Sequence, residues 1–142
     1  MTTERYRAAS VQLNSTTMWI LGGPLDSTEF LKSDSSVGIP GPKLPIPMSS
    51  LCTVKYSDHQ IYIIGGYGSM LNKVYIYNPM NGFTYIEGPA LINKRRLHVC
   101  SLMSNGQQSK IVVAGGTNGG VLSSVEIYDP TVNNWILGKE IQ

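Results

Sequence analysis

Short apolar segments recur along the chain, each bounded by polar residues and glycine. Three of them end in a pair of glycines, Met18–Gly23, Ile61–Gly66 and Ile111–Gly116. The pairs follow one another at intervals of about 43 to 50 residues, which is the period of a structural repeat. Apolar runs of this length, closed by turn residues, are typical of β-strands. The pattern therefore predicts repeated β-structure.

Other features recur in register with the glycine pairs. A further strand-like segment precedes each pair, at 7–13, 49–56 and 96–102, and a polar turn separates the two. After the second and third pairs come Tyr75–Pro79 and Glu126–Pro130, each closed by an Asn-Pro or Asp-Pro turn signal. Each of these two segments is followed by an aromatic residue that stands three positions before a glycine. The aromatic residues are Tyr85 and Trp135. Each unit is thus predicted to hold four short antiparallel strands, and the first unit carries Gly38 in place of the aromatic.

These features, in this order, resemble the kelch repeat over almost the whole chain. The resemblance implies an all-β fold: a β-propeller arc of three four-stranded antiparallel blades, at about 5–41, 48–88 and 95–138 of a single repeat region 1–142. Large aromatic plates can cover the flat face of a neighbouring blade. We therefore expect packing between blades, and not ligand stacking, from Tyr77, Tyr85, Tyr128 and Trp135.

Three blades are too few to close a propeller ring, which takes about four to eight. An open arc leaves one apolar face uncovered at each end. Two arrangements would cover these faces. Two copies could pair head to tail as a homodimer with a six-bladed ring, or the three blades could be a segment of a longer propeller.

Charge and hydropathy narrow the classes of partner. Charged residues make up only 14% of the chain and the net charge is +2, which argues against nucleic acid and anionic membranes as partners. The sequence contains no apolar run of about 18 residues and no apolar core near the N-terminus. A cytoplasmic location is the expectation.

The inventory of catalytic and metal-binding residues is thin. His59 and His98 belong to different units and have no His or Cys partner at metal-ligand spacing, so we expect no metal, no cofactor and no catalytic residues. Cys52 and Cys100 occupy the same place in the first strand-like segment of their units, which favours two small buried residues over a disulfide. Activation of Cys100 as a thiolate by His98, on the same strand face, is a weaker alternative.

The resemblance implies a non-catalytic module that binds acidic segments of a protein or peptide, with the loops between blades and the loop after each glycine pair as the binding face. Arginine suits this task because its planar fork can hold a carboxylate with two hydrogen bonds. For Arg95, a role in bracing the repeat is an equal alternative. The candidates by position are Arg5, Arg7, Tyr67, Ser69, Asn72, Lys94, Arg95, Arg96, Thr117 and Asn118.

Three specific roles remain open at this point. The resemblance suggests substrate recognition for a cullin-type ubiquitin ligase, although no BTB or BACK segment stands in these 142 residues. Binding of actin or another cytoskeletal protein is a second role implied by the same family. A propeller enzyme acting on a carbohydrate is the alternative from a different class, and it would need paired carboxylates or a metal cluster.

Overall fold

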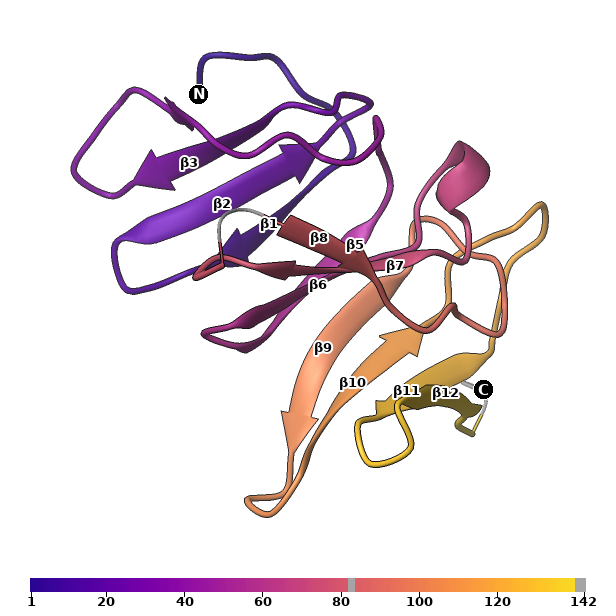
Figure 1. The fold of residues 1–142 in the computed structure, drawn as a ribbon. Helices are drawn as coiled ribbons and strands as arrows, with labels where there is room; N and C mark the ends of the chain where they lie inside the picture. The colour runs from indigo at the N-terminus through magenta and orange to yellow at the C-terminus, as the bar shows by residue number, and fades with distance from the viewer. Residues whose placement is uncertain (82–83, 140–142) are drawn as a thin grey trace.

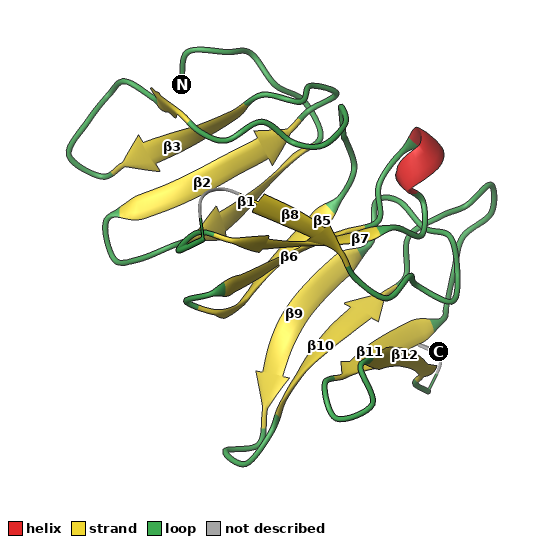
Figure 2. Cartoon of the chain, in the orientation of Figure 1, coloured by secondary structure: helices red, strands yellow, loops and turns green. Residues whose placement is uncertain are grey.

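The computed structural model describes residues 1–81 and 84–139, and β-strands dominate this part of the chain (Figure 2). The only helix in these two ranges is η1, a single 3-10 turn at Gly68–Met70. Nowhere in the same ranges does a helix have the length and apolar character needed to cross a membrane.

In the described ranges, twelve strands form three separate antiparallel sheets of four strands each, in simple up-and-down order. Blade 1 consists of β1 (Ala8–Gln12), β2 (Thr17–Gly22), β3 (Thr28–Lys32) and β4 (Ile39–Pro40). Blade 2 consists of β5 (Cys52–Ser57), β6 (Gln60–Ile64), β7 (Val74–Asn78) and β8 (Thr84–Glu87). Blade 3 consists of β9 (Val99–Ser104), β10 (Ser109–Ala114), β11 (Val125–Asp129) and β12 (Asn134–Leu137).

The three blades follow one another as an arc, from blade 1 at the top of Figure 1 to blade 3 at the bottom right. The first strands of the blades are neighbours, since β5 contacts both β1 and β9. This arrangement confirms the expected all-β propeller arc of three four-stranded blades.

Two hydrophobic clusters hold the arc together, one at each junction between blades. The first joins Trp19 and Leu21 of blade 1 to Ile61, Ile63 and Tyr77 of blade 2. The second cluster joins the other face of blade 2 to blade 3 and is made of Val54, Tyr62, Ile64, Val74, Ile76, Leu91, Ile111, Val113, Tyr128 and Trp135. Tyr85 packs against the first cluster, so all four aromatic residues expected between blades lie there.

One backbone device is repeated where each blade begins. Arg7, Ser50 and Leu97, each just before a first strand, adopt the left-handed conformation with φ of 56°, 56° and 55°. The amide of Ser50 donates to the carbonyl of Arg7 at 2.9 Å, and the amide of Leu97 donates to the carbonyl of Ser50 at 3.0 Å. These three positions are therefore structurally equivalent, and they link successive blades.

The expectation for the cysteines is wrong, because Cys52 and Cys100 form a disulfide between blades 2 and 3 with their Cα atoms 6.1 Å apart. Counted from the left-handed residues, Cys52 stands two positions after Ser50 and Cys100 three positions after Leu97. Side chains alternate between the two faces of a strand, so this offset of one residue turns the cysteines to opposite faces of their own blades. The two thiols therefore meet at the junction, and Cys100 is not available as a thiolate.

Candidate functional site

Arg95, which the sequence placed among the loop candidates, lies inside blade 3. Its side chain is 0% exposed and forms an ion pair of 2.8 Å with the equally buried Glu126. The guanidinium also donates to the carbonyls of Gly115 and Ser124, at 2.7 and 3.1 Å, and to the Ser124 hydroxyl. Glu126 in turn accepts hydrogen bonds from the amides of Ile92 and Asn93. Arg95 therefore ties the segment before blade 3 to its second and third strands.

Arg5 forms the same network in blade 1. It pairs with Glu29 at 3.3 Å and donates to the carbonyls of Gly22 and Ser27. Burial alone would raise the pKa of the Glu29 carboxyl, but hydrogen bonds from the amides of Thr2 and Thr3 lower that pKa to about 2. Because both guanidinium groups are buried and occupied, Arg5 and Arg95 brace their blades and do not belong to the surface predicted for a partner.

Arg96, the next residue, has a different environment. Its guanidinium carbon lies 4.7 Å from the ring centroid of Tyr67, which comes from the loop after β6 of blade 2. Arg96 forms no ion pair with any residue in the described ranges. Its backbone is fixed, since Arg96 and Thr117 exchange two hydrogen bonds of 3.0 and 2.9 Å. The segment between blades thus presents a charged group without a counterion on a rigid support.

A surface hollow of about 320 Å³ opens beside this pair, at the junction of blades 2 and 3. Its walls are Tyr67, Gly68, Leu71, Arg96, Asn118 and Gly119. Three of the predicted site residues, Tyr67, Arg96 and Asn118, are therefore brought together from three segments of the chain. Leu71 was missed by the sequence interpretation, although an apolar residue within a polar loop is a signal that could have indicated it.

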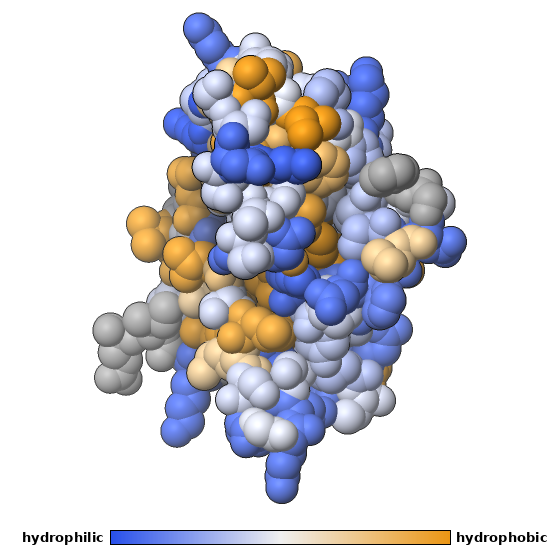
Figure 3. Space-filling model, turned by 90° about the vertical axis from the view of Figure 1, so that its left-hand side faces the viewer, coloured by the Kyte–Doolittle hydropathy of each residue, from blue (hydrophilic) through white to orange (hydrophobic). Residues whose placement is uncertain are grey.

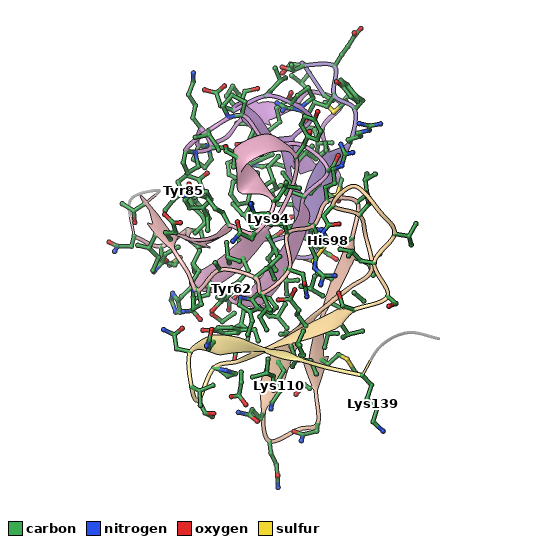
Figure 4. The ribbon with its side chains drawn as sticks, turned by 90° about the vertical axis from the view of Figure 1, so that its right-hand side faces the viewer. Tyr62, Tyr85, Lys94, His98, Lys110 and Lys139 are labelled. Carbon is green, nitrogen blue, oxygen red and sulfur yellow. A yellow bond between two sulfur atoms is a disulfide. The ribbon has the colours of Figure 1, made fainter. Side chains whose placement is uncertain are left out.

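The other candidates do not line this hollow. Arg7 is exposed, with its guanidinium carbon 5.9 Å from the ring centroid of Tyr6 in blade 1. Ser69 is exposed in η1, and Asn72 is half-buried, with a carbonyl that accepts from the amide of Leu91. Lys94 is exposed, one residue before Arg95 (Figure 4). The hydroxyl of Thr117 accepts from the amide of Gly119 and so shapes the loop from within.

The histidine nearest this region is a buried structural residue. Burial and the neighbouring Arg95 charge lower the pKa of His98 to about 4, so the imidazole is neutral at pH 7. It packs beneath the loops, since a Cβ added at Gly65 would lie 2.6 Å from its ring. No cluster of three or more His, Cys, Asp and Glu side chains that could hold a metal ion occurs in residues 1–81 and 84–139.

Comparison with known proteins adds to this geometry. A family model described as Kelch motif matches the chain twice, at residues 48–82 and 106–140. Among the solved structures that match is one titled "Structure of YjhT", with a TM-score of 0.80 and 16% sequence identity. The alignment covers 99% of this chain and 53% of that one, so the chain spans about half the length of that structure. No curated protein sequence matches the chain.

Proposed function

Since the chain belongs to the kelch-repeat family, we propose that it is a non-catalytic protein-interaction module whose hollow at Tyr67, Arg96 and Asn118 binds an acidic protein segment. The observation that carries the proposal is the Arg96 guanidinium, which is stacked on an aromatic ring at the rim of an open hollow. It has no carboxylate partner in the described part of its own chain.

The contact between Arg96 and Tyr67 favours recognition of a carboxylate. A guanidinium over a ring face is held by a cation–π attraction of about 0.5–1 kcal/mol at an exposed site. This attraction orients the group before a ligand arrives, so less conformational entropy is lost when a ligand binds. The group's N–H bonds remain available to two carboxylate oxygens at once. Leu71 and the Tyr67 ring offer apolar surface beside the charge.

The hollow is small and lies among loops, which favours a short peptide segment over a folded surface docked flat. Asn118 and the backbone of Gly119 supply polar groups on the far wall. A segment with one acidic residue next to an apolar one would satisfy the charge, the apolar wall and the polar wall together.

Binding to an array of peptides, with and without Asp or Glu, tests the proposal. The wild-type chain should bind a subset of the acidic peptides, and Arg96→Glu should lose them by roughly tenfold or more, because a charged pair becomes a like-charge contact. The free energy of unfolding should fall by no more than about 1 kcal/mol, which is the value of the lost contact with Tyr67, because the Arg96 side chain forms no ion pair in the described residues.

Lys94→Glu is the matched control, because Lys94 is an exposed cation two residues away that does not line the hollow. Its affinity for the peptides should stay close to wild type. Equal loss in both variants would show that net charge alone attracts acidic peptides, and retention of binding by Arg96→Glu would contradict the proposal.

The resemblance suggests a finer role, substrate recognition for a cullin-type ubiquitin ligase, which would use this same hollow for the substrate. Recovery of a cullin complex with the wild-type chain from cells supports this role. Arg96→Glu should keep the cullin and lose the substrate, because the two partners would bind different surfaces.

A further inference from the structure

The open face of blade 3 and the open face of blade 1, at the two ends of the arc, resemble the two faces that meet at each junction between blades. At the junction of blades 2 and 3, one face of blade 2 is covered by blade 3, and five of its side chains are at most 8% exposed. These are Val54, Tyr62, Ile64, Val74 and Ile76. Blade 3 has a face of the same kind, and no described residue forms a further blade against it.

The open face of blade 3 matches the covered face of blade 2 in chemistry. The residues at the five equivalent positions are Ser101, Val112, Ala114, Val125 and Ile127. Four of them are apolar and none is charged. Val99 and Met103 extend this face along β9 and are 68% and 60% exposed. The face is therefore built as a blade-to-blade surface and left uncovered.

The open face of blade 1 resembles the face of blade 2 that packs against blade 1. In blade 2 the receiving positions are Ile61, Ile63 and Tyr77, and all three are buried against blade 1. The equivalent positions of blade 1 are occupied by Met18, Ile20 and Leu31. They also are apolar, but here Met18 is 37% exposed and the other two are only half-buried. Figure 3 shows that hydrophobic groups reach the surface between hydrophilic ones on the side of the molecule at the left of Figure 1.

The backbone links between blades also stop at the two ends. Within the arc, each amide at the left-handed position donates to the carbonyl of the preceding blade, from Ser50 to Arg7 and from Leu97 to Ser50. Among the described residues, the carbonyl of Leu97 has no such amide opposite it and the amide of Arg7 no such carbonyl. A following blade would supply the donor at one end, and a preceding blade would supply the acceptor at the other.

We propose that a second copy of this chain covers both ends. The open face of blade 3 of each copy packs on the open face of blade 1 of the other, which makes two identical contacts around a two-fold axis. The contact is heterologous but closes, because three blades superpose on about half of the longer propeller chain. The result is a six-bladed ring made from two chains. This inference is independent of the peptide-binding proposal, because the hollow at Arg96 lies on neither end face.

Sedimentation equilibrium or light scattering over a range of concentrations tests the ring. The full chain should give twice its mass of 15.5 kDa, with no growth to larger species, because both ends of each copy are used. A monomer at high micromolar concentration would overturn the proposal. A mass that keeps rising with concentration would also overturn it, since that shows an open fibre and not a closed ring.

Ser101→Glu is the diagnostic variant. Ser101 is exposed in the single chain, so the substitution should leave the fold intact, but it stands where blade 2 has the buried Val54. An unpaired charge buried at a contact should weaken the dimer by roughly 100-fold or more, because each dimer contains the contact twice. Val121→Glu is the matched control: Val121 is 95% exposed in a loop, and its dimer constant should not change.

A lysine at the facing end sharpens the test. Ser10 is exposed on the outer face of β1, so Ser10→Lys alone should also give a monomer. Val99→Glu and Ser10→Lys in one chain should restore dimers, because these two positions are equivalent to the Cys52–Cys100 pair, so that each contact then joins opposite charges. If blades of a different chain or of a longer form of this chain cover the ends, the wild type studied alone stays monomeric, and that result rejects the second copy.

Discussion

Blade 2 builds the start of its repeat in a different way from blades 1 and 3. In the outer two blades a buried arginine and a buried glutamate occupy the equivalent positions, as Arg5 with Glu29 and Arg95 with Glu126. Blade 2 has Met48 and Tyr75 there, and both pack into the hydrophobic cluster between blades 1 and 2. The backbone is nevertheless the same, since Met48 and Arg95 each accept a hydrogen bond from the second glycine of the preceding blade.

The connecting segment of blade 2 explains why the glutamate is dispensable there. In blades 1 and 3 the carboxylate accepts from two backbone amides, those of Thr2 and Thr3 or of Ile92 and Asn93. The first of these positions is Pro45 in blade 2, and proline has no amide hydrogen to donate. A buried ion pair and the pair of Met48 with Tyr75 can therefore fill the same place in a blade, and the connecting segment before the blade differs accordingly.

The largest effect should come from breaking the ion pair of blade 3 on one side. Arg95→Met leaves Glu126 buried without its counterion, and we expect a loss of about 3–5 kcal/mol in the free energy of unfolding. The double variant Arg95→Met with Glu126→Tyr introduces the pair of blade 2 and should recover at least half of that loss. Denaturant unfolding measures both.

Adding Ile92→Pro should bring the stability of the double variant closer to wild type, because it removes one of the two amides, those of Ile92 and Asn93, that lose their acceptor with Glu126. Arg96→Met is the control, since the Arg96 side chain lies at the surface and the variant should lose at most about 1 kcal/mol, the value of its contact with Tyr67. A single Arg95→Met variant as stable as wild type would show that the ion pair contributes nothing.

The junction between blades 2 and 3 has a covalent link that the other junction lacks. Where blades 2 and 3 have Cys52 and Cys100, the equivalent residues between blades 1 and 2 are Ala9 and Thr53. The double variant Cys52→Ala with Cys100→Thr gives this junction the residues of the other one. We expect its free energy of unfolding to fall by about 2–4 kcal/mol, because the unfolded chain is no longer cross-linked and gains conformational entropy.

Denaturation midpoints with and without a thiol reductant measure this effect. The wild type should lose stability when reduced, whereas the Ala/Thr variant should show no change because it has no disulfide left. A wild type that unfolds at the same midpoint in both conditions would contradict a stabilising role for the bond.

The buried histidine of blade 3 should make stability depend on pH, in contrast to blade 2, where Leu51 occupies the same place. The pKa of His98 is lowered from 6.5 to about 4 in the folded chain, so the unfolded chain binds the proton first as the pH falls. The contribution of neutral His98 to the free energy of unfolding is complete above pH 6.5. It is lost as the pH falls from there toward the pKa of the folded state. Between pH 7 and pH 5 we expect a loss of about 2 kcal/mol.

His98→Leu should remove this part of the pH dependence when unfolding is measured at both pH values. His59→Gln is the matched control, because it replaces the other histidine, which is exposed in a turn. An unchanged profile in His98→Leu would assign the acid sensitivity to other groups.

Much of the fold could be predicted from the sequence because its signals are local and repeated. Three signals define the strands without knowledge of the rest of the chain. They are the glycine pairs at the ends of apolar strands, the turns that contain proline, and the aromatic residues that stand three positions before a glycine. Gly38, which replaces the aromatic of blade 1, also follows from the pattern, and the structure shows why a larger residue does not fit there: a Cβ would lie 2.3 Å from a Glu29 carboxylate oxygen.

The site and the disulfide were harder to predict because both depend on register across blades. Arg95 and Arg96 are adjacent in sequence, yet one is buried and the other lies at the surface, a difference set by the pairing with Glu126 thirty-one positions later. The cysteines differ by one position when counted from the left-handed residue of each blade, and the sequence pattern does not show this offset. One position along a strand moves a side chain to the opposite face of the sheet. Sequence patterns did identify the loops that meet at the hollow, since Tyr67, Arg96 and Asn118 were all among the candidates.

The smallest predicted effect concerns the left-handed residues, where all three blades agree in backbone and differ in side chain. Leu97 has a φ of 55° and is 54% exposed, so its side chain gains little from burial while its backbone is strained. Leu97→Gly should relieve about 1–2 kcal/mol of strain and increase the entropy of the unfolded chain, for a net gain of about 0.5–1 kcal/mol. Val99→Gly is the control two residues on, in strand β9 and also exposed, and it should lose stability because glycine weakens a strand. Equal losses in the two variants by thermal unfolding would contradict the prediction, because they would show that the left-handed link at Leu97 is not a point of strain that glycine relieves.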